Sequence, residues 1–111
     1  MKLPNREEAY IPPAKLEEYL LSETHSVGRL KASFLRAVGF DLKNPTMLKR
    51  RLIEIAQSED VTEAISAPHG VKYVVEGSLQ TPTGRLVQLR TVWIIETGQT
   101  SPRFVTAYPA E

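Results

Sequence analysis

The sequence contains no cysteine, and that absence removes three kinds of chemistry at once. Disulfide bonds, zinc sites with thiolate ligands and a cysteine nucleophile are all excluded. Long apolar runs are missing too: the longest stretches, VWII and IPPA, are far shorter than the ~20 residues of a membrane-spanning helix. The first twenty residues hold no apolar stretch of the kind found in signal peptides. We therefore expect a cytoplasmic protein that does not enter a membrane.

Motifs for metals and for several enzyme classes are also missing. The sequence has no H-E-x-x-H motif, no aspartate cluster and no ligand pair at a useful spacing, so neither a metal nor a cofactor is expected. Nucleophile-elbow and dinucleotide-binding fingerprints are absent as well. The net charge of +1 gives little long-range attraction for a polyanion, although LKRRL makes the N-terminal half locally basic.

What is present divides the single expected domain of residues 1–111 into two parts. The first part, about residues 14–58, has the apolar periodicity of helices. Three helices are expected: one in AKLEEYLL, one that ends at Gly39, and one that begins at Pro45 after a capping Asn44. Ahead of them, the apolar tag AYI is expected to add an edge strand.

The second part, about residues 71–109, is rich in β-branched and aromatic residues. KYVVEGSLQ, RLVQLRTVWIIET and RFVTAYP are predicted strands, and turn residues between them indicate an antiparallel meander. SEDVTEAISAPHG is interpreted as a loop with a brief extended piece near Ala64 to Ser66. The predicted fold class is α+β: about three N-terminal helices packed on one face of a three- to four-stranded antiparallel meander.

Alternation along the middle strand separates two faces. Val87, Leu89, Thr91, Trp93 and Ile95 share the face that we expect to be buried. The other face then carries Arg90 with exposed Val92 and Ile94. An arginine in mid-strand indicates either a ligand or a cross-strand partner, for which Glu76 and Glu96 are the candidates.

The last strand adds hydroxyl groups. Strict alternation turns Phe104, Thr106 and Tyr108 to one face and Val105 and Ala107 to the other, and either face is apolar enough to be buried. Thr106 and Tyr108 are two residues apart, so together with Arg90 they would offer donors to one phosphate. The alternative is that both were selected as strand formers.

A second group of candidates lies at the start of the expected second helix. His25 has a side chain with a reference pKa of about 6.5, suited to acid–base catalysis. Gly28 stands where free backbone N–H groups at the helix start would hold an anion, and Lys31 follows it. The structural alternatives are a loop histidine without a role, a glycine that permits a tight helix entry, and a solvated lysine.

Taken together, KLEEYLL, H-x-x-G-x-x-K-A-x-F-L-x-x-x-G-F, TVWII and FVTAYP resemble a family of small bacterial domains of unknown function over nearly the whole chain. That family usually has His-Pro where this chain has His25-Ser26. The order of helices, meander and a final T-x-Y strand is also similar to the barnase, EndoU, colicin and RelE ribonuclease-toxin superfamily. The second likeness is one of layout and a few polar residues.

The likeness to ribonuclease toxins implies metal-independent RNA cleavage, in which a ribose 2′-OH attacks the neighbouring phosphate. It implies His25 as acid or base, Lys31 as a phosphate ligand, and Thr106 and Tyr108 as donors to the phosphate or a base. Arg90 joins this set as our inference from its strand face. The alternative function is a non-enzymatic interaction module, binding a protein partner or a second copy through the open sheet face.

Overall fold

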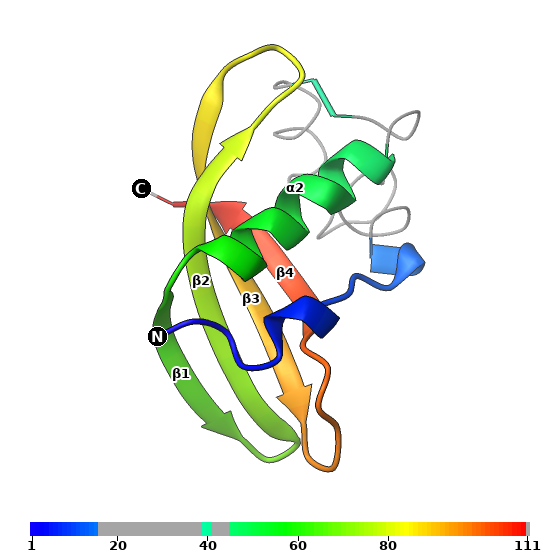
Figure 1. The fold of residues 1–111 in the computed structure, drawn as a ribbon, viewed down its shortest axis with the longest axis vertical. Helices are drawn as coiled ribbons and strands as arrows, with labels where there is room; N and C mark the ends of the chain where they lie inside the picture. The colour runs from blue at the N-terminus through cyan, green and yellow to red at the C-terminus, as the bar shows by residue number, and fades with distance from the viewer. Residues whose placement is uncertain (16–38, 41–44, 111) are drawn as a thin grey trace.

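A four-stranded antiparallel sheet dominates the structure, a computed structural model that describes residues 1–15, 39–40 and 45–110 (Figure 1). The strands lie in the order of the chain, so the sheet is a simple meander. Its elements are η1 (Arg6–Glu8), α2 (Pro45–Ser58), β1 (Val61–Ala67), β2 (Gly70–Gln80), β3 (Leu86–Glu96) and β4 (Arg103–Pro109). The three strands expected from the sequence are found as β2, β3 and β4.

The expected layer of about three N-terminal helices is wrong. α2 is the one α-helix whose bounds lie in the described ranges, and strands predominate there. Most of the two preceding helices expected from the sequence would fall in residues 16–38, outside the described part of the chain. Residues 61–67, interpreted largely as a loop, form β1, because β-branched Val61, Thr62 and Ile65 gain a hydrogen-bonded partner in β2.

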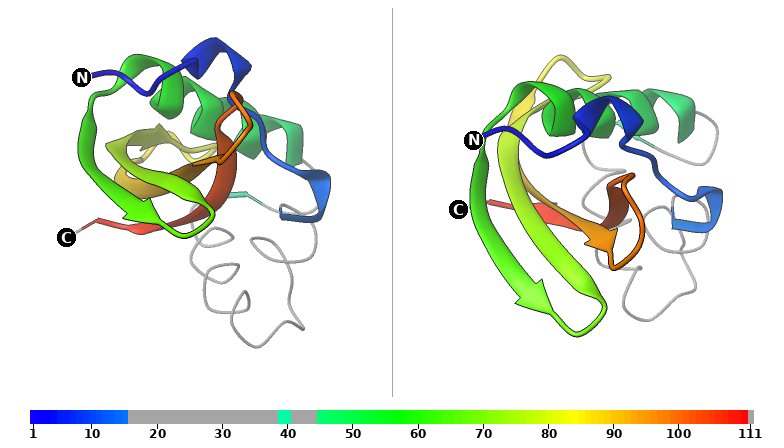
Figure 2. Two further views of the ribbon diagram at one scale, coloured as in Figure 1. Left: turned by 90° about the horizontal axis from the view of Figure 1, so that it is seen from below. Right: turned by 60° about the horizontal axis from the view of Figure 1, so that its bottom comes forward.

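One face of the sheet is covered by α2 and by the N-terminal segment, which lie on the same side of it (Figure 2). Trp93 and Phe104 from the sheet and Leu48 and Leu52 from α2 are fully buried in the common core. Leu89 and Thr91 are buried beside them, which confirms that the tryptophan face of the middle strand is the core face. Thr91 also receives a hydrogen bond from the indole Nε1 of Trp93, at 2.8 Å.

A bulge in β4 changes the faces expected for the last strand. Trp93 pairs with Phe104 while the preceding Val92 pairs with Thr106, so Val105 is the extra residue. Phe104 therefore faces the core, whereas Thr106 and Tyr108 lie on the opposite face. The expectation that all three share one face is wrong for Phe104, because strict alternation does not continue through a bulge.

The N-terminal segment joins both edges of the sheet. Lys2 forms an antiparallel bridge with Asp60 next to β1, and Tyr10 forms a parallel bridge with Arg103 at the start of β4. The Tyr10 bridge has two backbone hydrogen bonds of 3.0 Å. The AYI tag thus meets the sheet edge in an isolated bridge and does not form the expected edge strand. Leu3, Ala9 and Ile11 of this segment are buried in the core.

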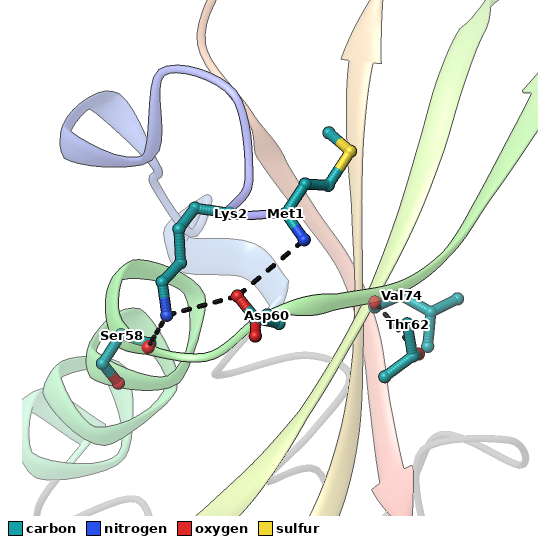
Figure 3. A network of polar contacts seen from close by, with 6 residues as sticks. All are labelled: Met1, Lys2, Ser58, Asp60, Thr62 and Val74. Atoms are coloured by element: carbon teal, nitrogen blue, oxygen red, sulfur yellow. Dashed lines mark hydrogen bonds and ion pairs between the residues drawn. The ribbon is translucent and has the colours of Figure 1, made fainter.

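Figure 3 shows the first attachment, where Lys2 connects the chain start to the end of α2. Its ammonium group donates to the Ser58 carbonyl at 2.6 Å and lies 3.4 Å from the Asp60 carboxylate. A cation at this position stabilises the helix, because the free carbonyl groups at the C-terminal end of a helix carry a partial negative charge. We expect Lys2→Met to lower the free energy of unfolding by about 0.5–1 kcal/mol, measured by urea denaturation with Trp93 fluorescence.

The matched control for this prediction is Lys49→Met. Lys49 is exposed on α2 and forms no ion pair with the described residues, so its removal should leave the unfolding midpoint unchanged. Equal losses in the two variants would contradict a specific role for the Lys2 contacts.

Candidate polar site on the second sheet face

Three polar side chains form a row across the sheet face opposite α2. Backbone register pairs Glu76 of β2 with Arg90 of β3, and Arg90 with Tyr108 of β4. The Arg90 Nη2 atom lies 3.3 Å from the Glu76 Oε2 atom, and its guanidinium carbon lies 5.7 Å from the centre of the Tyr108 ring. The cation is thus held between a carboxylate and an aromatic ring. We call Glu76, Arg90 and Tyr108 the central row.

The central row fixes the charge of Arg90. The Tyr108 side chain, and then the negative charge of Glu76, raise the pKa of the guanidinium above its ordinary value. Its side chain remains 40% exposed, so the cation can meet a ligand from solution. The Nε atom is buried and has no hydrogen-bond partner among the described residues.

Thr106 extends the same face toward the turn that joins β3 and β4. It pairs with Val92, two residues from Arg90 on β3, so the Thr106 and Arg90 side chains are diagonal neighbours. Arg90, Thr106 and Tyr108 thus share one face, as the candidate site requires. His25, Gly28 and Lys31 lie outside the described residues, and their approach to this face stays a prediction.

The apolar patch expected beside Arg90 is wrong for Ile94. Only 6% of Ile94 is exposed, and Val92 is half-buried. Ile94 stands between Lys72 and Arg103 in the register, and the aliphatic stems of such side chains cover neighbouring apolar surface. A pattern of alternation could not reveal this cover, because it depends on what the two adjacent strands place opposite Ile94.

The pairing register shows which of the two candidate glutamates is the partner of Arg90. Glu76 pairs with Arg90, whereas Glu96 accepts hydrogen bonds from Arg103 Nε at 2.9 Å and from Nη2 at 2.5 Å. The Glu96–Arg103 pair borders a small polar pocket of about 300 Å³. Arg103 was not among the candidate residues from the sequence. It is the first residue of the last strand, and an arginine at that position does not indicate a binding site.

A wider groove of about 600 Å³ runs between α2 and the ends of β2 and β3. Arg51 lines it and binds Glu54 at 3.0 Å, while its Nε atom is buried without a partner in the described part of the chain. Arg51 belongs to the basic run Lys49–Arg51, which could bind phosphate but has the sequence of an ordinary solvated helix face, so the pattern does not single it out. The opposing carboxylates Glu54 and Glu59 make this groove a poorer anion site than the central row.

Two features are absent from the described residues. These residues contain no cluster of three or more histidine, cysteine, aspartate or glutamate side chains arranged to hold a metal ion. In the same ranges, no helix is long and apolar enough to cross a membrane.

The chain matches one protein family over nearly its whole length. The model of DUF6883, a domain of unknown function, matches residues 2–111. The chain is a member of the DUF6883 family. The resemblance to a family of uncharacterised domains is thereby confirmed. No curated protein is similar in sequence to this DUF6883 chain.

A solved structure adds a likeness in fold. This DUF6883 chain is similar to a chain of the contact-dependent growth inhibition toxin–immunity protein complex from Klebsiella pneumoniae 342. The two share 15% sequence identity with a TM-score of 0.72, over 96% of this chain and 97% of the other. At that identity the similarity concerns the fold alone, and it agrees with the toxin-like layout expected from the sequence.

Proposed function

We propose that this DUF6883 chain is a toxin-related nuclease domain that cleaves RNA without a metal ion and holds the scissile phosphate at Arg90. One observation carries the proposal: a fully charged, 40% exposed guanidinium is fixed in mid-sheet between Glu76 and Tyr108. Glu76 is a cross-strand partner of Arg90, and the Arg90 side chain nevertheless stays open to solvent. The planar guanidinium matches phosphate oxygens in two parallel hydrogen bonds.

The reaction consists of an internal displacement at phosphorus. The ribose 2′-OH attacks the neighbouring phosphate and gives its proton to a base, while the 5′-oxygen leaves with a proton from an acid. The products are a 2′,3′-cyclic phosphate and a 5′-OH. Arg90 stabilises the charge that develops on the phosphate, and Thr106 and Tyr108 contribute hydroxyl donors. His25 is the candidate acid or base and Lys31 a second cation, both carried by the resemblance.

The test is cleavage of a short RNA oligonucleotide by the purified chain in the presence of EDTA. We expect a 2′,3′-cyclic phosphate product, and no cleavage of the same oligonucleotide with 2′-deoxyribose throughout. Arg90→Ala should slow cleavage about 100-fold or more, as removal of a transition-state donor does in other enzymes. His25→Ala should also abolish cleavage. Intact RNA with the wild-type protein at high concentration would overturn the proposal.

Arg103→Ala is the matched control for Arg90→Ala. Arg103 also pairs with a glutamate and its side chain is 34% exposed, but it lies outside the central row. The loss of an exposed ion pair alone costs little stability, so Arg103→Ala should cleave RNA within about threefold of the wild type. Equal loss of activity in both variants would indicate general damage to the sheet.

Binding of a protein partner is the second candidate function. The solved neighbour is a toxin–immunity protein complex, which favours a protein partner for this fold. Ile65 and Tyr108 are 44% and 36% exposed on the same sheet face and offer apolar contact surface. If RNA stays intact, light scattering across a concentration series separates a homodimer from a chain that needs a different partner.

A further inference from the structure

Tyr108 occupies an unusual position in the central row. It lies near the end of β4, which is an edge strand of the sheet. The N-terminal segment bridges β4 only at Arg103, the opposite end of the strand, among the residues described. One flank of the Tyr108 ring is occupied by Arg90, and the side chain is 36% exposed. Part of the Tyr108 side chain is therefore open to solvent beside the Arg90 cation.

We propose that Tyr108 is a stacking platform for a nucleobase, and that the ligand of this face is single-stranded RNA. This inference rests on the proposed function, because it places the base beside the phosphate that Arg90 holds. Arg90 and Tyr108 are directly opposite in the register, so their side chains are separated by a few ångströms. A base and a phosphate of one short strand segment can therefore reach both groups.

In the binding of RNA, the role assigned to Tyr108 is that of its ring face, whereas its hydroxyl group acts in the cleavage step. A guanidinium on one side of the ring holds it in place, which lowers the entropy lost when a base stacks on the other side. Stacking on aromatic side chains tolerates any base, because every base has a π-face.

Charge and shape favour a single strand over a duplex. With a net charge of +1, the chain gains little from the phosphate backbone alone, so contacts to the bases must supply much of the affinity. In a duplex the base faces are stacked on one another and are closed to an aromatic side chain, whereas unpaired bases can be splayed onto it. Tyr108 thus selects nucleotides in loops, ends and other unpaired segments.

The experiment uses a fluorescein-labelled RNA 8-mer with 2′-O-methyl groups throughout, which cannot be cleaved by attack of the 2′-oxygen. Fluorescence anisotropy compares its affinity for the wild-type chain, Tyr108→Phe and Tyr108→Leu. Tyr108→Phe keeps the ring and should bind within about twofold of the wild type. Tyr108→Leu should bind about 5- to 140-fold more weakly, which is the fold-change that one stacked base contributes. The blunt duplex of the same sequence should bind more weakly than the single strand.

Tyr10→Leu is the control, because Tyr10 is 44% exposed and lies at the other end of β4. It should leave affinity unchanged. Equal binding by Tyr108→Leu and the wild type, or a preference for the duplex, would overturn the stacking role even if RNA is cleaved. Stacking-dependent binding without cleavage would uphold this inference and overturn the proposed catalysis. A weak Tyr108→Phe variant would assign the effect to the hydroxyl and refute the ring-face role.

Discussion

Trp93→Ala is expected to lower the free energy of unfolding by about 3–5 kcal/mol, the range for loss of a large buried aromatic side chain. Trp93 is fully buried, and its ring meets Phe104 edge-to-face with centres 5.3 Å apart. Its Nε1 atom donates to Thr91, whose hydroxyl donates in turn to the Val75 carbonyl at 2.7 Å. The substitution therefore removes packing, an aromatic pair and one end of a buried hydrogen-bond chain.

Urea denaturation followed by circular dichroism measures this loss, because the variant has no tryptophan fluorescence. Trp93→Phe is the matched variant: it keeps most of the aromatic volume and leaves Thr91 bonded to Val75. We expect it to be destabilised by less than half as much as Trp93→Ala. A Trp93→Ala protein with the wild-type midpoint would contradict the position of Trp93 at the centre of the core.

Gly70→Ala is expected to lower the free energy of unfolding by about 2–4 kcal/mol, the sum of backbone strain and steric conflict. Gly70 begins β2 with a φ of +150°, a conformation that side-chain-bearing residues rarely adopt. A Cβ atom there would lie 2.3 Å from the Ile95 carbonyl oxygen and 2.7 Å from the Glu96 Cα atom. Both contacts are with the backbone of β3, so no side-chain rotation can relieve them.

Gly84→Ala separates the two contributions to the Gly70 effect. Gly84 also has a positive φ, of +85°, but a Cβ atom there would meet no other atom within 4 Å. It should lose only about 1 kcal/mol, the strain of the backbone conformation itself. Thermal or urea denaturation of both variants measures the difference. If the two variants were equally stable, the close approach of β2 and β3 at Gly70 would be wrong.

The parts of the fold that the sequence predicts are those in which local pattern and tertiary structure agree. β2, β3 and β4 combine β-branched residues with clear turns, and the alternation in β3 identifies Trp93 and Leu89 as buried. Only a brief extended piece near Ala64 to Ser66 is predictable within β1, because most of this strand is exposed and has no apolar alternation to recognise. Its extended conformation depends on pairing with β2, which is a contact between segments.

The candidate site was predictable in composition and less so in geometry. Arg90 in mid-strand was a visible anomaly, and Glu76 was one of two partners that spacing allowed. The alignment of Tyr108 with Arg90 required the pairing register of β3 and β4, and a register that includes a bulge is not encoded in alternation. The burial of Ile94 likewise depends on the neighbours opposite it in two other strands.

The extra residue Val105 divides β4 into two segments: Phe104 before it faces the core, and Tyr108 after it faces the opposite side. Without it, Phe104 and Tyr108 would point to the same side, and one strand could not both anchor the core through Phe104 and present Tyr108 beside Arg90. The bulge at Val105 changes which side of the sheet the following side chains face. The exposed positions after Val105 can therefore vary in sequence while Phe104 keeps its place in the core. A substitution at Tyr108 can thus alter the exposed end of the last strand while the core contacts of Phe104 stay in place.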